Sequence, residues 1–137
     1  MKKALLLLVV GLSLALTLSA CGGGASAPST TINVTMTDFQ FSPNKFTVPA
    51  GAQISFSAVN NGGVEHSFMI MKLGHEIKDH FTDVDMANAY WMKLGIQPGE
   101  SVSDTFTAPA DPGTYQIVCH MSGHFEAGMI ATLIVVK

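Results

Sequence analysis

The sequence predicts an all-β protein, an antiparallel β-sandwich of about eight short strands. Three observations support this class. Short segments in which apolar and polar residues alternate recur along the chain, β-branched and aromatic residues are frequent in them, and turn sequences separate them. Short strands with turns at regular intervals are typical of a sandwich of two packed sheets.

The turn signals set the order of the strands. The clearest are Asn60-Asn-Gly-Gly63, Gln97-Pro-Gly-Glu100 and Pro109-Ala-Asp-Pro-Gly113. Between these and weaker turns we expect strands at Ile32–Met36, at Lys45–Val48 with a further β signal at Phe39 and Phe41, and at Gln53–Val59, Val64–Met71, Trp91–Ile96, Ser101–Thr107, Thr114–Cys119 and Met129–Val136.

One segment, Lys72–Tyr90, does not alternate. It is predicted to contain a helical turn or two between His75 and Ala89. In a β-sandwich such a segment would lie as a short, partly helical flap outside one sheet.

The first 20 residues have the pattern of a secretory signal peptide. Met1–Lys3 is positively charged, Ala4–Leu18 is apolar, and small residues follow. Leu18-Ser-Ala-Cys21 resembles the bacterial lipobox, which implies that Cys21 is acylated and anchors the chain to a membrane. Two alternatives remain open: a membrane-anchoring helix, or ordinary cleavage near Ala20 that releases a soluble protein.

Three regions follow from this N-terminal pattern. We predict a lipoprotein signal peptide in residues 1–20, the lipidated cysteine and a flexible Gly/Ser-rich tether in residues 21–31, and one folded domain in residues 32–137. The mature protein is expected on the extracytoplasmic side, periplasmic or at the cell surface, anchored to the membrane as a lipoprotein.

The charge of the chain argues against a nucleic-acid partner. The full chain has a formal net charge of −3. Removing Lys2 and Lys3 with the signal peptide leaves five lysines, no arginine and ten carboxylates, a net charge of −5. Nucleic-acid binding needs a basic face, which this composition does not supply.

A lone cysteine near the C-terminus belongs to a regular pattern. If Cys21 is acylated, Cys119 has no cysteine partner in an exported protein, and such a thiol is often used chemically. His124 and Met129 follow it at five-residue steps, and His66 upstream can supply a second imidazole. These four side chains offer a thiolate, two imidazoles and a thioether.

Strand phase places these four residues at one end of the sandwich. Side chains alternate between the two faces of a strand, so Cys119, Met129 and His66 are each in phase with apolar, core-type neighbours. Cys119 and Met129 lie at the two ends of one hairpin loop, with His124 midway. Gly123 gives His124 freedom to turn inward.

The ligand types indicate the metal. Thiolate with imidazole is compatible with zinc as well as copper. The thioether favours copper, because two His, one Cys and a weak axial Met form the ligand set of blue-copper electron-transfer sites. A single usable cysteine excludes a binuclear copper site bridged by two thiolates.

At this point the sequence resembles the cupredoxins, the blue type 1 copper proteins that include plastocyanin, auracyanin and rusticyanin. The Cys-x4-His-x4-Met spacing is similar to that of the auracyanin and rusticyanin type. The resemblance covers most of the mature chain through Val48-Pro-Ala-Gly51, Asn60-Asn61 before His66, Gln97–Glu100, Pro112-Gly-Thr-Tyr115 and the loop from Cys119 to Met129.

The resemblance implies a Greek-key sandwich that holds one copper ion, cycling between Cu(II) and Cu(I). It implies a trigonal set of His66, Cys119 and His124 with Met129 axial. His124 would be the electron port, and its surface patch would include Met121, Phe125 and Ala127. Ser67 stands where the family often has Asn, next to the first ligand, and would tune the site.

The same resemblance predicts an electron carrier rather than an enzyme. Its partners would be redox proteins, one donating and one accepting single electrons in transient complexes, and the protein itself is expected to be a monomer. The alternatives are a protein for copper delivery or tolerance, and a small copper redox enzyme with an open coordination position.

Other candidate ligands stay open from the sequence alone. His120 follows Cys119 and is an alternative imidazole ligand, and Glu126 is an alternative axial oxygen donor. His75 and His80, with the acidic residues around them, could bind a second metal. A solvated flap face is the simpler interpretation of that second group.

Overall fold

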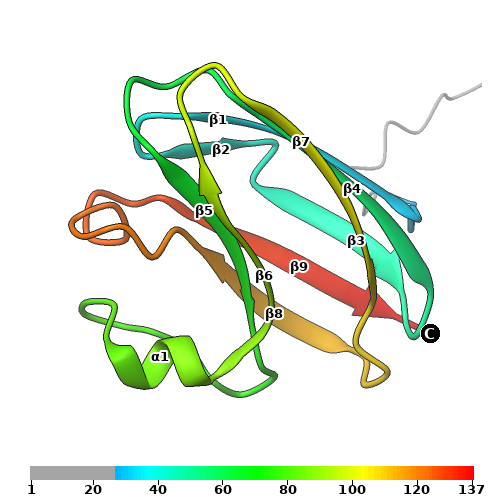
Figure 1. Cartoon of the computed structure of the whole chain (residues 1–137). Coiled ribbons are helices and arrows are strands. Elements are labelled where there is room, and N and C mark those ends of the chain that lie inside the picture. Colours follow the sequence, from blue (N-terminus) through cyan, green and yellow to red (C-terminus); the bar gives the residue numbers. More distant parts are fainter. Residues whose placement is uncertain (1–26) are drawn as a thin grey trace, which may run out of the picture.

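The computed structural model describes residues 27–137, which form two packed β-sheets (Figure 1). One sheet has the strand order β2-β1-β4-β7, and the other has the order β3-β9-β8-β5-β6. The prediction of an all-β sandwich is therefore confirmed. In chain order the elements are β1 (Thr31–Thr37), β2 (Gln40–Ser42), β3 (Lys45–Pro49), β4 (Gln53–Asn60), β5 (His66–Met71), α1 (Asp83–Ala87), β6 (Ala89–Ile96), β7 (Ser101–Thr107), β8 (Gly113–Val118) and β9 (Ile130–Val136).

The N-terminal predictions are not decided by this structure. Cys21, the signal peptide and most of the proposed tether lie outside the described residues. Within residues 27–137 no helix is both long and apolar enough to cross a membrane.

Alternating burial builds the interface between the two sheets. In β1 the side chains of Ile32, Val34 and Met36 are buried while their neighbours face outward, and β4 and β9 alternate in the same way. Most neighbouring strands are antiparallel, but β1 pairs with β4, and β3 with β9, in parallel. Pairings between individual strands were not predicted, and these two are parallel because the chain changes sheets between the paired strands.

An aromatic cluster joins the sheets in the interior. Trp91 of β6 stacks on Phe106 of β7, with ring centroids 4.5 Å apart and planes 21° from parallel. Phe68 of β5 is fully buried and packs against Phe56 of β4 at 4.9 Å. Because Phe68 lies two residues after His66 on the same strand face, this packing fixes the strand that carries the first predicted ligand.

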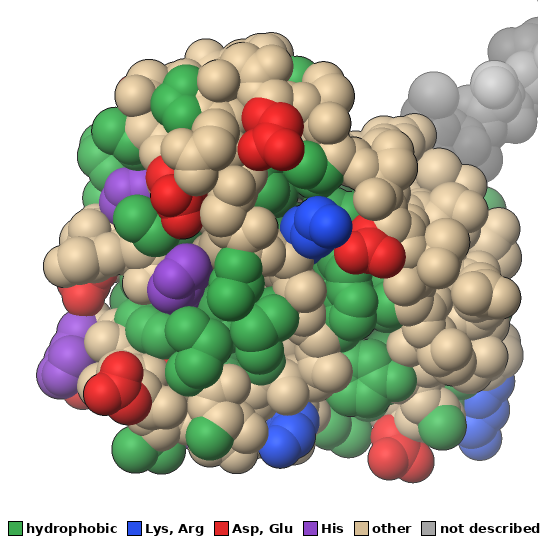
Figure 2. All heavy atoms as spheres, viewed as in Figure 1, with side chains coloured by type: hydrophobic (Ala, Val, Ile, Leu, Met, Phe, Trp, Pro, Cys, Tyr) green, Lys and Arg blue, Asp and Glu red, His purple; other side chains and the backbone are tan. Residues whose placement is uncertain are grey.

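The strand β5 is buried on both faces. Its outward-facing Met69 and Met71 pack with Ile77, Val118 and Phe125 in a second apolar cluster. This cluster lies under residues 72–88, and α1 and its flanking loops lie beside the five-stranded sheet (Figure 1). Figure 2 shows hydrophobic side chains gathered over the same region. The predicted flap, with one short helix, is therefore present outside one sheet.

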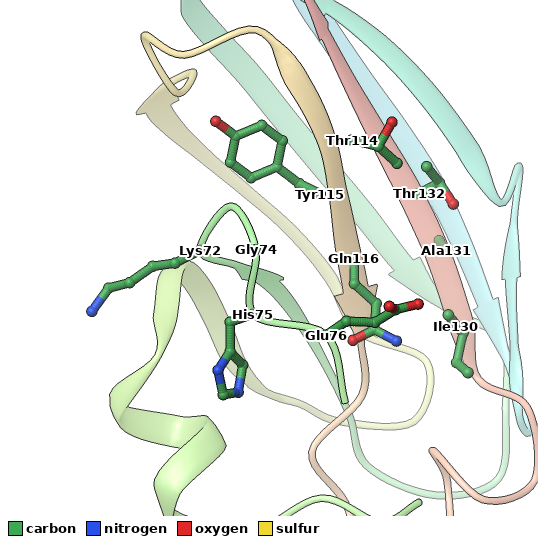
Figure 3. A pocket seen from close by; sticks show the side chains of 10 residues that line it. All are labelled: Lys72, Gly74, His75, Glu76, Thr114, Tyr115, Gln116, Ile130, Ala131 and Thr132. Carbon is green, nitrogen blue, oxygen red and sulfur yellow. The ribbon is translucent and has the colours of Figure 1, made fainter. Parts of the chain in front are cut away.

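One set of hydrogen bonds attaches the flap to the sheet, and a second set holds the flap together internally. The Gln116 side chain of β8 accepts a hydrogen bond from the Ile77 N–H at 2.9 Å and donates one to the Ile77 carbonyl at 3.0 Å. Figure 3 shows Gln116 beside the flap segment in the groove between that segment and strands β8 and β9. The buried Asp85 carboxylate accepts hydrogen bonds from Thr82 N–H and Oγ1, at 2.7 and 2.6 Å, and lies 2.7 Å from His75 Nε2.

The substitution Asp85→Ala is expected to destabilise the protein by about 1–3 kcal/mol, because the polar groups of Thr82 and His75 lose their acceptor. Burial favours protonation of Asp85, but the hydrogen bonds from Thr82 and His75 outweigh it and hold the pKa of Asp85 below its usual range. Its stabilisation is therefore complete above the ordinary pKa of aspartate and is lost as the pH falls through the lowered pKa. Urea unfolding of the wild type and the variant between pH 7 and pH 3 measures both effects.

The matched control is Asp79→Ala, which removes an exposed carboxylate from the same flap. Its unfolding free energy should stay close to that of the wild type. An equal loss in both variants would contradict a specific role for Asp85.

Candidate metal centre

One loop carries three of the four predicted ligands. β8 ends one residue before Cys119, and β9 begins one residue after Met129. The loop is closed by its own backbone: Met129 N–H donates to the His124 carbonyl at 2.9 Å, and Cys119 N–H donates to the Met129 carbonyl at 3.4 Å. Gly123, just before His124, has a φ of 81°, a left-handed conformation that favours glycine.

The donor atoms of His66, Cys119 and His124 converge. The two Nδ1 atoms lie 3.2 Å apart, and Cys119 Sγ lies 3.4 Å from Nδ1 of His124 and 4.0 Å from Nδ1 of His66. The circumcentre of this triangle is about 2.1 Å from each atom, which agrees with the metal bonds of about 2.0–2.3 Å that imidazole nitrogen and thiolate sulfur form. His66 and Cys119, which strand phase placed at one end of the sandwich, therefore lie together with His124 of the loop.

Met129 lies at the end of the same loop. Its side chain is fully buried, and its backbone is bonded to both Cys119 and His124. The thioether is therefore held inside the protein beside the loop residues that supply the sulfur and one imidazole. Its role as the axial ligand stays a prediction.

A buried asparagine fixes the turn that precedes β5, the strand that begins with His66. Asn60 is fully buried at the end of β4, where its amide donates to the carbonyls of Val64 and Ile96 at 2.8 and 2.9 Å. Its Oδ1 accepts the N–H of Gly62 at 2.8 Å. With all these groups satisfied, Asn60 holds the turn from 60 to 65 in one conformation and so sets the position of His66.

The surroundings of His66 favour its neutral form. Burial and the neighbouring His124 lower the pKa of His66, although the carboxylate of Asp38 acts in the opposite direction. In a neutral imidazole one ring nitrogen carries no proton, and its lone pair is free to bind a metal ion. The ring is therefore ready for a metal at neutral pH without first losing a proton.

Ser67, the residue after His66 in β5, contacts the sulfur of Cys119. Its N–H points to Cys119 Sγ at 3.4 Å, and its hydroxyl lies 3.6 Å from the same atom. The Ser67 hydroxyl also accepts the N–H of His120 at 3.0 Å and lies 2.7 Å from His120 Nδ1. Ser67 therefore supplies polar contacts around the sulfur and links it to His120.

The turn between β1 and β2 was not predicted to be part of the site. Asp38 Oδ1 lies 3.4 Å from His66 Nε2, and the Phe39 ring meets the His124 ring edge to face with centroids 5.1 Å apart. Phe39 has a φ of 68°, the only positive value at a non-glycine residue in the described part of the chain. The sequence signal was weak, an Asp-aromatic pair between two β segments, which alternation assigned to strand structure.

The structure separates the remaining candidates. Phe125 was expected near the surface patch, but it is 5% exposed and packs inside the second apolar cluster, so it does not line a docking surface. Met121 is partly buried against the main core, whereas Ala127 is exposed. Glu126 is exposed, which does not favour it as an internal axial donor.

The alternative histidines are not part of the converging group. His120 bonds to Ser67 on the outer face of the sheet, and His75 bonds to Asp85. Within residues 27–137 the group of His66, Cys119 and His124 is the one set of three His, Cys, Asp or Glu donors that converges. A second metal site around His75 and His80 therefore has no geometric support there.

Comparison with known proteins agrees with this fold and donor set. Residues 6–135 match the sequence model of the cupredoxin-like domain. The chain is 30% identical over 118 residues to the copper-resistant cuproprotein CopI of Rubrivivax gelatinosus, covering 82% of this chain and 70% of that protein. It is 31% identical over 110 residues to auracyanin-B of Chloroflexus aurantiacus, covering 69% of this chain and 46% of that protein.

Solved structures show the same architecture. Reduced auracyanin from Roseiflexus castenholzii superposes with a TM-score of 0.68 at 29% identity, covering 80% of this chain and 99% of that one. A reduced rusticyanin, at 23% identity, superposes with a TM-score of 0.56 and covers 79% of this chain and 81% of that one.

The chain belongs to the cupredoxin-like family. The cofactor that this family implies is one copper ion, and the residues present fit it. A buried thiol and two imidazole nitrogens converge at metal-binding separations, and a buried thioether lies at the end of the same loop.

The close approach of Asp38 to His66 requires glycine at position 62. A Cβ at Gly62 would collide with Asp38 Oδ1 and lie 2.9 Å from His66 Nε2. We expect Gly62→Ala to destabilise the protein by about 1–3 kcal/mol through this overpacking. Chemical denaturation of the metal-free protein measures the loss.

Gly63→Ala is the matched control. A Cβ there would meet Asp38 Oδ2 at 3.5 Å, an ordinary van der Waals contact. It should cost clearly less stability than Gly62→Ala. Equal costs would show that the turn, rather than the crowding at His66, is sensitive to alanine.

Proposed function

We propose that the protein is a type 1 copper electron carrier in which His66, Cys119 and His124 are the trigonal ligands and Met129 is the axial ligand. When bound, copper supplies reversible one-electron chemistry between Cu(II) and Cu(I). The protein residues hold the donors in place and exclude water, and His124 connects the metal site to the surface. This assignment rests on the donor geometry and on membership of the cupredoxin-like family.

The burial of the donors carries the proposal. The side chains of His66, Cys119 and Met129 are 0% exposed, and that of His124 is 8% exposed. An enzyme needs room for a substrate at the metal, and a delivery protein needs an accessible ligand exchange route. A closed site that approaches the surface through one imidazole supports electron transfer instead.

The surroundings of the site favour a small structural change with redox state. Asn60 fixes the turn before His66, Ser67 contacts the sulfur, and the closed loop fixes His124 and Met129. Donors held in this way cannot relax far when the charge of the metal changes. A small reorganisation permits fast electron transfer.

Electrons would enter and leave through the His124 edge of the molecule. Phe39 is 43% exposed and packs on the His124 ring, and Ala127 is exposed on the ligand loop. Apolar side chains at such a position suit brief docking of redox partners. We further propose that acylated Cys21 and the tether in residues 21–31 keep the domain at the outer surface of a membrane, where it meets its donor and acceptor.

The visible absorption and EPR spectra of the purified protein after Cu(II) addition test the assignment. An intense thiolate-to-copper band in the wild type and its loss in Cys119→Ser are expected, because the band requires the sulfur ligand. Ser67→Ala is the control, since it changes a neighbouring residue and leaves the sulfur in place. A colourless wild type, or equal copper binding in the Cys119→Ser variant, would refute the proposal.

Met129→Gln tests the axial ligand. We expect the variant to retain copper and to have a lower reduction potential, because an amide oxygen is a harder donor than a thioether and favours Cu(II). Cyclic voltammetry of the two proteins gives the comparison. An unchanged potential would show that Met129 is not the axial ligand.

A copper-tolerance function is the second candidate, favoured by the 30% identity to a copper-resistant cuproprotein. It predicts rapid and complete transfer of copper to a chelator. Slow loss of copper together with fast electron exchange would favour the carrier.

A further inference from the structure

The turn between β1 and β2 reaches across from the four-stranded sheet to the imidazoles of the site. Asp38 approaches His66, and Phe39 packs on His124. Both residues come from the end of β1, which pairs in parallel with β4. Adjacent residues of one turn therefore contact the two imidazoles from outside the donor triangle.

The geometry of the His66 ring defines which nitrogen must carry a proton. Its Nδ1 faces His124 and Cys119 and is the atom of the converging group. A neutral imidazole that offers one nitrogen as a donor to a metal carries its hydrogen on the other, here Nε2. Nε2 is completely buried and has no hydrogen-bond partner among the described residues.

The Asp38 carboxylate is placed to accept that hydrogen. Its Oδ1 lies 3.4 Å from Nε2, longer than a good hydrogen bond, and no other described group makes a hydrogen bond with Nε2. A buried N–H without an acceptor costs about 1–3 kcal/mol. An acceptor at Asp38 reduces this penalty and so stabilises the observed arrangement of the two side chains.

The carboxylate is held by the protein. The Gly63 N–H donates to Asp38 Oδ1 at 2.9 Å, and Gly62 leaves the space that the oxygen and the imidazole share. Asn60 fixes the same turn from the interior. Asp38 is therefore directed toward His66 by the turn between β4 and β5 as well as by its own strand, although its side chain is 45% exposed.

We propose that Asp38 is a positioning residue for the metal centre: it accepts the Nε2 hydrogen of His66, orients Nδ1 toward the metal, and lowers the reduction potential through its negative charge. A carboxylate behind a metal-bound histidine raises the basicity of the ligand. The same charge favours Cu(II) over Cu(I). This role rests on the function proposed above.

The first test measures the reduction potential at low ionic strength. Asp38→Asn keeps an acceptor oxygen but removes the charge, so its potential should rise above that of the wild type. Asp111→Asn is the control, because Asp111 is an exposed carboxylate in the turn before β8, at the opposite end of that strand from Cys119. A potential for Asp38→Asn that matches the control would overturn the charge effect.

The second test needs no copper. In the metal-free protein at neutral pH, the ¹⁵N shifts of His66 should show the Nε2–H form in the wild type and in Asp38→Asn, and a mixture of tautomers in Asp38→Ala. Copper competition should show about 10–100-fold weaker Cu(II) binding for Asp38→Ala than for the wild type.

The outcomes separate this inference from the proposed function. If the wild type forms no thiolate-to-copper band, the carrier proposal fails, while the tautomer experiment still decides whether Asp38 positions His66. If the wild type is blue but Asp38→Ala keeps the Nε2–H form and binds copper as tightly, the role of Asp38 is refuted and the carrier proposal stands.

Discussion

The confinement of three polar donors in a dry interior is the constraint on which this structure depends. A thiol and two imidazoles lie within 4 Å of one another, and burial deprives them of water. Such groups are costly unless partners satisfy them. The surrounding residues supply some of these contacts: the Ser67 N–H points to the sulfur, Asp38 faces the His66 ring, and Phe39 packs on the His124 ring.

The parts that sequence could predict are those set by local periodicity. Alternation located the strands within one or two residues, and the five-residue steps from Cys119 to Met129 identified one loop with three candidate donors. His66 could be added because it shares a strand face with apolar residues. Each of these inferences needs information from one segment only.

The parts that could not be predicted depend on how distant segments meet. Parallel pairing of β1 with β4 brings Asp38 to His66, and no feature of either segment encodes that pairing by itself. Phe125 looked like a surface residue of the ligand loop, yet the flap provides an apolar cluster that buries it.

Both sheets contribute to the donor positions, which couples the metal to the fold as a whole. His66 lies in the five-stranded sheet and Cys119 directly follows its strand β8, while Asn60 ends β4 and Asp38 follows β1 of the other sheet. Any separation of the sheets would remove these supports from His66. A metal that binds only the native arrangement therefore adds its binding free energy to the stability of the sandwich. The aromatic packing of Phe68, Trp91 and Phe106 joins the two sheets. The same packing fixes the ligands, so the rigidity of the site follows from the packing of the core.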